Sequence, residues 1–356
     1  MQTGLSAGTT YFYKVVAVVE AGASTGITGN QSTLNGATYY WTGATGGAWS
    51  TFSNWNTSAD GSGTVPTAWA TSDVHIIDGE GTASGGALSI SVDRTNFTIG
   101  QIKIVGNTNL TLSSSAATTR TITVSGGPNE DFILEAGSTL NLTNANNAIA
   151  FTFSGSGNTG VIGGAYVASG STSNNLTTTS GINTLVTVSS TGSITSNLNS
   201  ISAAIVGSIP TLLFQNGSNY IHSNSTTTNY IPTATWQANA TATLNGNTTG
   251  TSLTSNSTSL GNLVINMTAS TATFSAFTST ARTISGNLTI NNTGTGKFRA
   301  VTSGLLTIKG NLIINGGTFE VGSLGTGGII VEGNASVATG AVLDVLQSTL
   351  QIGGNM

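Results

Sequence analysis

The sequence predicts an all-β fold: a right-handed parallel β-helix, or β-solenoid, with a Trp-rich N-terminal cap and a partial β-hairpin in front of the cap. Three observations support this prediction. The dipeptide Gly-Asn recurs about every two dozen residues, short runs alternate apolar with polar residues, and no stretch places apolar residues at helical spacing.

The Gly-Asn repeat sets the length of one coil. The opening glycines are Gly261, Gly286, Gly310, Gly333 and Gly354, and the steps between them shorten slightly towards the C-terminus. One period holds two or three short strands with turns between them, and stacked coils pair their backbones about 4.8 Å apart. A β-sandwich also has short strands punctuated by glycine, but it needs no fixed period, so the repeat favours the solenoid.

The alternation within each repeat predicts which side chains face the core. In GNLTI, Leu288 and Ile290 lie on one face of the strand and Thr289 on the other, because successive strand residues point to opposite sides. The runs GNLVI at 261–265 and GNLII at 310–314 follow the same scheme. We therefore expect Leu288 and Ile313 to point inward.

Residues 1–36 differ from the rest of the chain. The run TYFYKVVAVV alternates strictly and is followed by a Gly-containing turn after Glu20. It resembles the last two strands of a fibronectin type III domain, which implies that the other strands of such a domain are missing. Because a lone hairpin cannot bury a core, we expect it either to dock on the first coil or to be the remainder of a longer chain.

Residues 37–81 hold four of the five tryptophans: Trp41, Trp49, Trp55 and Trp69. The first coil of a solenoid has an open edge that would recruit other chains, so a bulky aromatic cap is expected there. The alternative interpretation is a glycan-binding platform in which these rings stack on sugars.

Residues 82–356 are predicted to be the coils, cut short at the C-terminus. Charged residues make up 6% of the chain, against about 25% in an ordinary domain, and none occurs from residue 136 to residue 281. The net charge of −4 and the lack of a basic run argue against nucleic acid as a partner. No run of about 18 apolar residues exists, which argues against membrane insertion, and without cysteine there is no disulfide framework.

The combination of segments carries a wider resemblance. The fibronectin-like strands, the cap motif WTG…GAWSTFSNW, the stretch YIHSNSTTTNYIPTATW at 220–236 and the GNLTI coils resemble large secreted surface proteins and adhesins of Bacteroidota, of the type IX secretion kind. The resemblance implies an extracellular or cell-surface location, although the chain begins without a signal peptide. It also implies a non-catalytic structural or adhesive module, with surface glycans or neighbouring copies of the chain as partners.

Enzymes with this fold that act on acidic polysaccharides need clustered carboxylates for Ca²⁺ and a nearby base. Asp73, Asp78 and Glu80, within SDVHIIDGEG, form such a cluster in the sequence. Asp73 and Asp78 would face opposite sides of an extended strand, and His75 would share the face of Asp73. Asp-Gly and Glu-Gly are more typical of turns, so we predict turn residues here, and likewise for the run from Asn129 to Asp131.

Other chemistry has weaker candidates. Lys297, Arg299 and Lys309 predict a small basic spot that is either a solvated face or a site for an acidic sugar. No pair of carboxylates is singled out for glycoside hydrolysis, and neither histidine lies in a nucleophile motif. The sequence therefore predicts no catalytic residue, metal or cofactor.

Two alternatives to a structural and adhesive module stay open. The first is a polysaccharide-degrading β-helix enzyme. The second is an ice-binding solenoid, because threonine arrays such as TATLNGNTT from residue 241 provide ordered hydroxyls. Since coil lengths vary, however, we expect the threonines not to keep register from coil to coil.

Overall fold

A computed structural model describes the chain as an all-β protein. The described residues are 10–15, 18–19, 22–23, 27–32, 36–81, 87–127, 129–198, 204–223, 228–246, 252–254, 257–277, 281–301, 303–322, 327–346 and 348–356. Within them the single helix is the short 3₁₀ turn η1 (Phe52–Asn54). No helix in this part of the chain has the length and hydropathy to cross a membrane.

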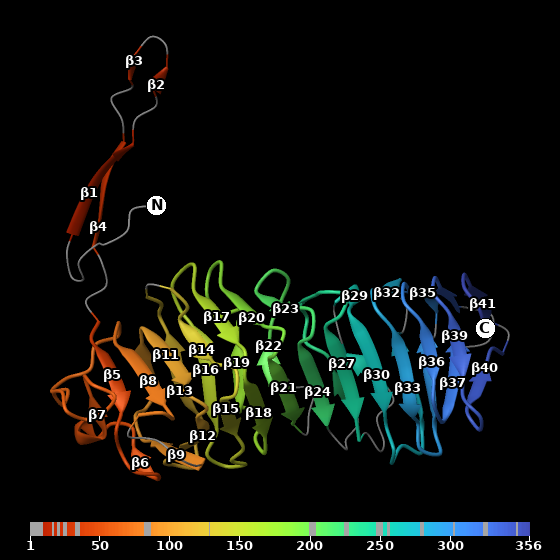
Figure 1. The fold of residues 1–356 in the computed structure, drawn as a ribbon, viewed down its shortest axis with the longest axis horizontal. Coiled ribbons are helices and arrows are strands. Elements are labelled where there is room, and N and C mark those ends of the chain that lie inside the picture. Colours follow the sequence, from red (N-terminus) through yellow and green to blue (C-terminus); the bar gives the residue numbers. More distant parts are fainter. Residues whose placement is uncertain are drawn as a thin grey trace.

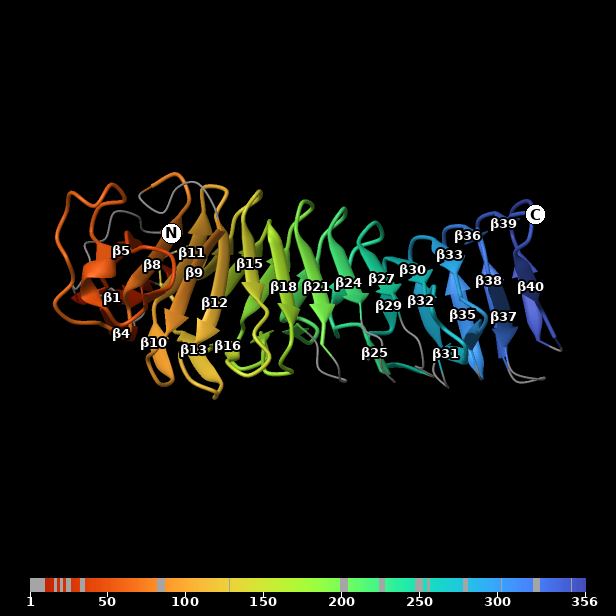
Figure 2. The same cartoon turned by 90° about the horizontal axis from the view of Figure 1, so that it is seen from below.

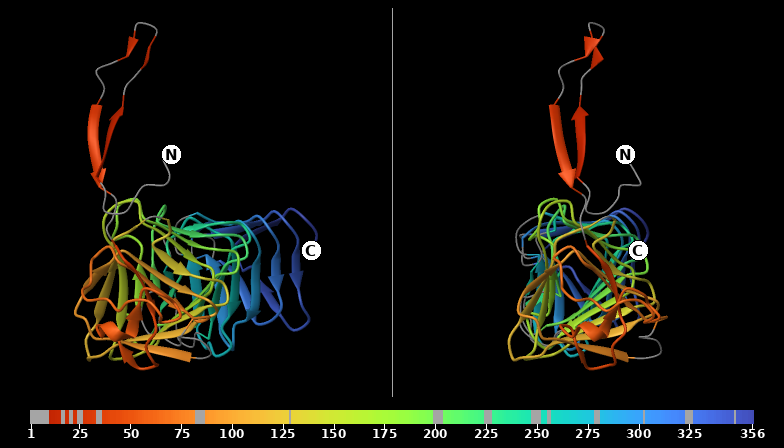
Figure 3. Two further views of the ribbon diagram at one scale, coloured as in Figure 1. Left: turned by 60° about the vertical axis from the view of Figure 1, so that its left-hand side comes forward. Right: turned by 90° about the vertical axis from the view of Figure 1, so that its left-hand side faces the viewer.

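The strands form a parallel β-solenoid, as the sequence predicts (Figures 1 and 2). From β8 on, each coil contributes one strand to each of three faces, and a strand pairs in parallel with the strand three places further along the chain, except between β22 and β25 and between β26 and β29, where a sheet divides. Seen from the N-terminal end, the coils lie behind one another (Figure 3, right).

One face is a single sheet of 12 strands, called here the long sheet. Its strands are β6 (Gly47–Ala48), β9 (Ala87–Val92), β12 (Asn109–Ser114), β15 (Thr139–Leu142), β18 (Ala165–Ser169), β21 (Ser193–Asn197), β24 (Asn219–Ser223), β27 (Thr241–Asn245), β30 (Asn262–Asn266), β33 (Leu288–Asn292), β36 (Leu312–Ile314) and β39 (Ala335–Val337).

The second face begins as a nine-stranded sheet and continues, from β29 on, as a five-stranded one. The first comprises β5 (Thr38–Trp41), β7 (Trp55–Asn56), β8 (Val74–Asp78), β11 (Gln101–Val105), β14 (Phe132–Leu134), β17 (Thr159–Ile162), β20 (Leu185–Val188), β23 (Leu212–Phe214) and β26 (Thr235–Trp236). The other comprises β29 (Ser259–Leu260), β32 (Arg282–Ile284), β35 (Gly304–Ile308), β38 (Gly327–Val331) and β41 (Thr349–Ile352).

The third face likewise has two parts, a five-stranded and then a six-stranded sheet. The first comprises β10 (Phe97–Ile99), β13 (Arg120–Val124), β16 (Ile149–Phe153), β19 (Asn175–Thr177) and β22 (Ile205–Val206). The other comprises β25 (Thr228–Tyr230), β28 (Ser252–Thr254), β31 (Thr273–Phe277), β34 (Lys297–Val301), β37 (Thr318–Gly322) and β40 (Val342–Asp344).

The inward side chains of all three faces form one core that runs along the solenoid. Leu288 and Ile290 are fully buried, as predicted. In the third face Phe274, Phe298 and Phe319 stack in register, with ring centroids 5.7 and 6.0 Å apart. Each coil therefore covers the apolar edge of its neighbour, which is how a solenoid buries a core that no single coil could bury.

The prediction that Ile313 faces inward is wrong. On β36, Leu312 and Ile314 are buried, whereas Ile313 is partly exposed and pairs with the outward Thr289. In the Gly-Asn repeats that open at Gly261, Gly286, Gly310 and Gly333, the residue directly after the asparagine enters the core, so Leu312 is the counterpart of Leu288.

The Gly-Asn dipeptides form two continuous ladders at one corner of the solenoid. The amide of each opening glycine donates to the carbonyl of the preceding one over 2.9 to 3.1 Å. Each asparagine Oδ1 accepts the backbone N–H of the next asparagine over 2.7 to 2.9 Å. This asparagine ladder consists of Asn262, Asn287, Asn311, Asn334 and Asn355. A Cβ on Gly310 would lie 2.5 Å from the Oδ1 of Asn287, which explains why glycine precedes the asparagine.

The N-terminal strands form an antiparallel hairpin, in agreement with the sequence. β1 (Thr10–Val15) pairs with β4 (Ile27–Ser32), and β2 (Val18–Val19) pairs with β3 (Gly22–Ala23). Ala17, Glu20 and Ala21 lie outside the described residues, and Gly22 of the predicted turn lies in β3. None of these four strands pairs with a described strand of the solenoid, and Figure 1 shows the hairpin projecting from its N-terminal end. Docking on the first coil and origin from a longer chain both stay predictions.

Candidate functional site

The tryptophan-rich segment covers the N-terminal end of the core. Trp41, Trp49 and Trp55 are at most 1% exposed, and Trp55 lies 5.1 and 4.9 Å from Trp41 and Trp49 between ring centroids. The indole N–H of Trp55 donates to the carbonyl of Trp49 over 2.9 Å. These three rings close the first coil, and none presents a face on which a sugar could stack.

Trp69 is the partly exposed member of the four tryptophans. Its ring meets Tyr39 edge to face at 5.7 Å, and the guanidinium of Arg94 lies 5.8 Å from its centroid. Arg94 also covers Phe97, at 4.4 Å. Trp69 packs against the core, and because the other three tryptophans are buried, the four rings do not form a shared stacking platform.

His75 lies inside the cap and is fully buried. Its ring is surrounded by Trp49, Trp55 and Trp69 at centroid distances of 5.3, 4.8 and 5.3 Å. Burial, with a smaller contribution from the positive charge of Arg94, lowers the pKa of His75 to about 3. A neutral imidazole in this position acts as part of the aromatic packing.

Asp73 and Asp78 of the predicted acidic cluster accept hydrogen bonds from backbone N–H groups. Asp73 is 2% exposed, and its carboxylate accepts the N–H groups of Ala37 and Ala70 over 3.0 and 2.6 Å. Asp78 accepts the N–H of Glu80 over 3.0 Å, which is a turn of the kind predicted. No three or more His, Cys, Asp or Glu side chains are grouped to hold a metal ion in the residues that the structure describes.

The run from Asn129 to Asp131 is also a turn. Asn129 has a φ of 68°, in the left-handed region that asparagine tolerates. Asp131 is 2% exposed and accepts the N–H groups of Gly127 and Thr159 over 2.7 and 2.8 Å. Its carboxylate thus holds two consecutive coils together.

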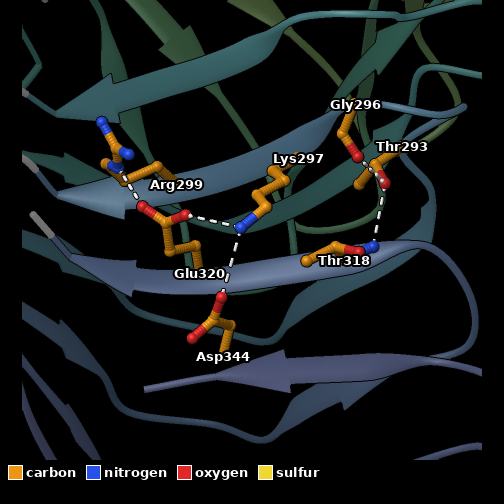
Figure 4. A network of polar contacts seen from close by, with 7 residues as sticks. All are labelled: Thr293, Gly296, Lys297, Arg299, Thr318, Glu320 and Asp344. Carbon is orange, nitrogen blue, oxygen red and sulfur yellow. Dashed lines mark hydrogen bonds and ion pairs between the residues drawn. The ribbon is translucent and has the colours of Figure 1, made fainter. Parts of the chain in front are cut away.

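The predicted basic spot is an ion-pair cluster instead (Figure 4). Lys297 Nζ lies 3.3 Å from Glu320 Oε2 and 3.2 Å from Asp344 Oδ2, and Arg299 pairs with the other oxygen of Glu320. Glu320 is 2% exposed, and its two carboxylate oxygens are both engaged. The pairs raise the pKa of Lys297. Lys309 is exposed and is not part of this cluster.

Glu320 and Asp344 are two carboxylates that coil stacking places on neighbouring strands. Glycoside hydrolysis needs one carboxyl group that donates a proton and a second that acts as base or nucleophile. Here Lys297 bridges both carboxylates. The arrangement holds β34, β37 and β40 together and provides no separate acid and base.

The most extensive regular surface is the outer face of the long sheet, which the sequence reasoning did not single out. A middle row of outward side chains keeps strict register from strand to strand. This middle row consists of Ser89, Thr111, Asn141, Val167, Thr195, Ile221, Thr243, Val264, Thr289, Ile313 and Ser336. In the sequence, this row corresponds to the residue that lies between the two inward positions of each strand, and aligning these residues would have predicted it.

The expectation that variable coil length would break the register is wrong for this face. Along the middle row the chain takes a much shorter path from Thr243 to Val264 than from Thr111 to Asn141, yet both pairs are direct neighbours. The turns and the other faces absorb the difference. Residues 247–249 of the predicted threonine array lie outside the described residues.

No family model, no curated protein and no solved structure matches this chain. The geometry of the chain itself is therefore the basis for its proposed function.

Proposed function

We propose that this chain is a non-catalytic extracellular module with a structural and adhesive role: a stiff stalk or display surface of a large cell-surface or filament-forming protein. The observation that supports this best is the unbroken core with its backbone ladders, which connects every coil to the next. Because each coil contacts only its neighbours, such a rod extends a surface without needing a larger globular core.

The side-chain ladders add stiffness to the backbone pairing. The asparagine ladder continues over the last coils, and buried carboxylates such as Asp131 bond across coils elsewhere. A bond between consecutive coils resists sliding of one coil past the next, because a shift by one residue would turn the core side chains outward. These properties suit a stalk or a fixed binding surface.

The state of the acidic residues supports a non-catalytic role. Asp73 and Asp131 bind backbone N–H groups, and Glu320 is held between Lys297 and Arg299. These groups are already committed to holding the fold. The extracellular location rests on the resemblance to secreted surface proteins of Bacteroidota.

One observation favours ice binding as a second candidate. The middle row of the long sheet keeps register, and it includes Thr111, Thr195, Thr243 and Thr289. Hydroxyl and methyl groups in such a regular row can hold water molecules in a regular arrangement, as binding to ice requires. Thermal hysteresis of the freezing point, lost on replacing Thr243 by a larger residue, would support this candidate.

The proposed role is tested by a turnover assay. The full chain is incubated with neutral and acidic polysaccharides, and released reducing ends and unsaturated products are measured. We expect no release above that of heat-denatured protein. Release that falls in the Glu320→Gln or Asp78→Asn variant, with folding intact, would establish an enzyme in place of the module. Solution scattering of the same sample should give the profile of a rod.

A further inference from the structure

The outer face of the long sheet is free of charge. Its 12 strands contain no Asp, Glu, Lys or Arg, and their one histidine, His222, points into the core. Charged side chains occur on the other faces, for example Lys103 on β11 of the second face and Glu320 on β37 of the third. A partner that fits this face by charge is therefore uncharged.

Side-chain amides on this face are held in place by one another. Asn141 Nδ2 donates to Asn109 Oδ1 over 2.9 Å, and Asn266 Nδ2 donates to Asn245 Oδ1 over 3.0 Å. Asn141 Nδ2 also donates to the carbonyl of Leu110 over 3.2 Å. Each amide has two N–H donors and two acceptor sites, so these bonds leave the oxygen of Asn141 and the N–H groups of Asn109 for a partner. Because the side chains are already ordered, a partner that binds them loses less conformational entropy.

The middle row, which includes Asn141, alternates in character over its later strands. From β21 to β36 it reads Thr, Ile, Thr, Val, Thr, Ile at a spacing of about 4.8 Å. All six side chains are short and β-branched, and all are partly exposed. The row offers hydroxyls and methyl groups together, which match the hydroxyls and the C–H groups of a sugar ring.

Other classes of partner fit this face less well. Nucleic acids and anionic polymers need cationic side chains, which these strands lack. Protein interfaces concentrate their binding energy in Trp, Tyr and Arg, and the tyrosines of this sheet, Tyr166 and Tyr220, are both buried. Ice requires a rigid lattice match, but Ile221, Val264 and Ile313 interrupt the threonine hydroxyls. A flexible polymer can adjust to such interruptions.

We infer that the outer face of the long sheet binds an uncharged, hydroxyl-bearing polysaccharide along the axis of the solenoid. The inference rests on the proposed adhesive role and names the ligand class and the face that role would use. The amides recognise sugar hydroxyls, and the β-branched middle row packs against the ring carbons.

The test compares one substitution on two faces. Thr243 lies in the middle row of the long sheet, and Thr187 lies outward on β20 of the second face; both are partly exposed strand threonines. The full chain and its Thr243→Arg and Thr187→Arg variants are sedimented with insoluble cellulose and with chitin. We expect Thr243→Arg to weaken retention about tenfold, a loss of about 1.4 kcal/mol, and Thr187→Arg to change it less than about twofold.

Several controls make the outcome decisive. Circular dichroism checks that each variant folds, and Thr289→Arg replaces Thr243→Arg if it does not. Retention of the parent chain should be the same at low salt and at about 1 M salt, because no charge takes part.

Equal losses in both variants, loss of retention at high salt, or no retention on either polysaccharide would overturn the inference. Retention in growing ice without retention on polysaccharide would also overturn it, in favour of ice. Turnover of the polysaccharide would instead refute the proposed non-catalytic role and leave the binding face standing.

Discussion

Leu312 and Ile313 are neighbours on β36, and only Leu312 lies in the core. An aspartate at position 312 would bury a charge without a partner, so we expect Leu312→Asp to lower the free energy of unfolding by about 3 kcal/mol or more. Ile313→Asp places the same carboxylate on the solvent side and should cost about 1 kcal/mol, from lower strand propensity. Urea denaturation followed by circular dichroism measures both; equal losses would show that the strand faces are assigned wrongly.

His75 makes the stability of the cap depend on pH. Its pKa is about 3 in the folded chain and about 6.5 when unfolded, so between these values the unfolded state binds the proton. The contribution of the neutral ring is fully present above pH 6.5 and is lost as pH falls towards 3, by up to about 1.4 kcal/mol per pH unit.

The matched variant is His75→Phe, which keeps an aromatic ring among the tryptophans and cannot titrate. We expect the melting temperature of the parent chain to fall more steeply than that of the variant between pH 7 and pH 4. Parallel pH profiles for the two proteins would contradict the role assigned to His75.

The burial of single residues was predictable wherever the alternation was clear. Leu288 and Ile290 flank a polar threonine, so the sequence shows which face is apolar. The run Leu312, Ile313, Ile314 is apolar throughout, and alternation cannot set its phase. The asparagine ladder sets it, because the bond from the N–H of Asn311 to the Oδ1 of Asn287 fixes where the strand begins.

The asparagine ladder makes a distinct prediction for the coil corner. Asn311 Oδ1 accepts the N–H of Asn334 over 2.9 Å, so Asn311→Ala leaves that N–H without its acceptor and should cost about 1 kcal/mol. Asn315→Ala is the control, because its amide bonds only the exposed side chain of Asn291. Hydrogen exchange at the amide of Asn334 measures the effect; unchanged protection in Asn311→Ala would count against the ladder.

The ion-pair cluster predicts a salt-dependent contribution of the last coils. Glu320→Gln removes the carboxylate between Lys297 and Arg299 and should cost about 1 to 2 kcal/mol, because both cations are partly exposed and screened. Asp344→Asn should cost less, since Asp344 is 27% exposed and pairs with Lys297. Thermal melting at low and high salt checks this order, and an equal effect of both variants at all salt concentrations would contradict it.

Contacts between coils were harder to predict than the strands themselves. The repeat indicated the coil spacing, but the pairing of Arg299 with Glu320 and of Glu320 with Asp344 depends on adding one coil length to each position. Both steps fall within the range of spacings between the Gly-Asn dipeptides. Adding one period to the positions of the charged residues would have predicted an ion-pair cluster in place of the basic spot.

Across the whole solenoid, the sequence predicted the parallel coils and the tryptophan cap because glycine spacing and aromatic clustering are local signals. The charge-free face is a property of 12 strands together. It emerges only when coils of different lengths are aligned, with their extra residues placed in the turns. The regular surface is therefore evident in the structure, whereas the sequence repeat alone does not show which residues align on it.

The most direct test of a non-catalytic binding rod is one measurement with two readouts. The full chain is mixed with suspended cellulose, and the bound protein and the released sugar are determined in the same tube. We predict protein in the pellet and no soluble sugar above the denatured control. Soluble sugar that increases with time and with protein concentration would contradict this interpretation.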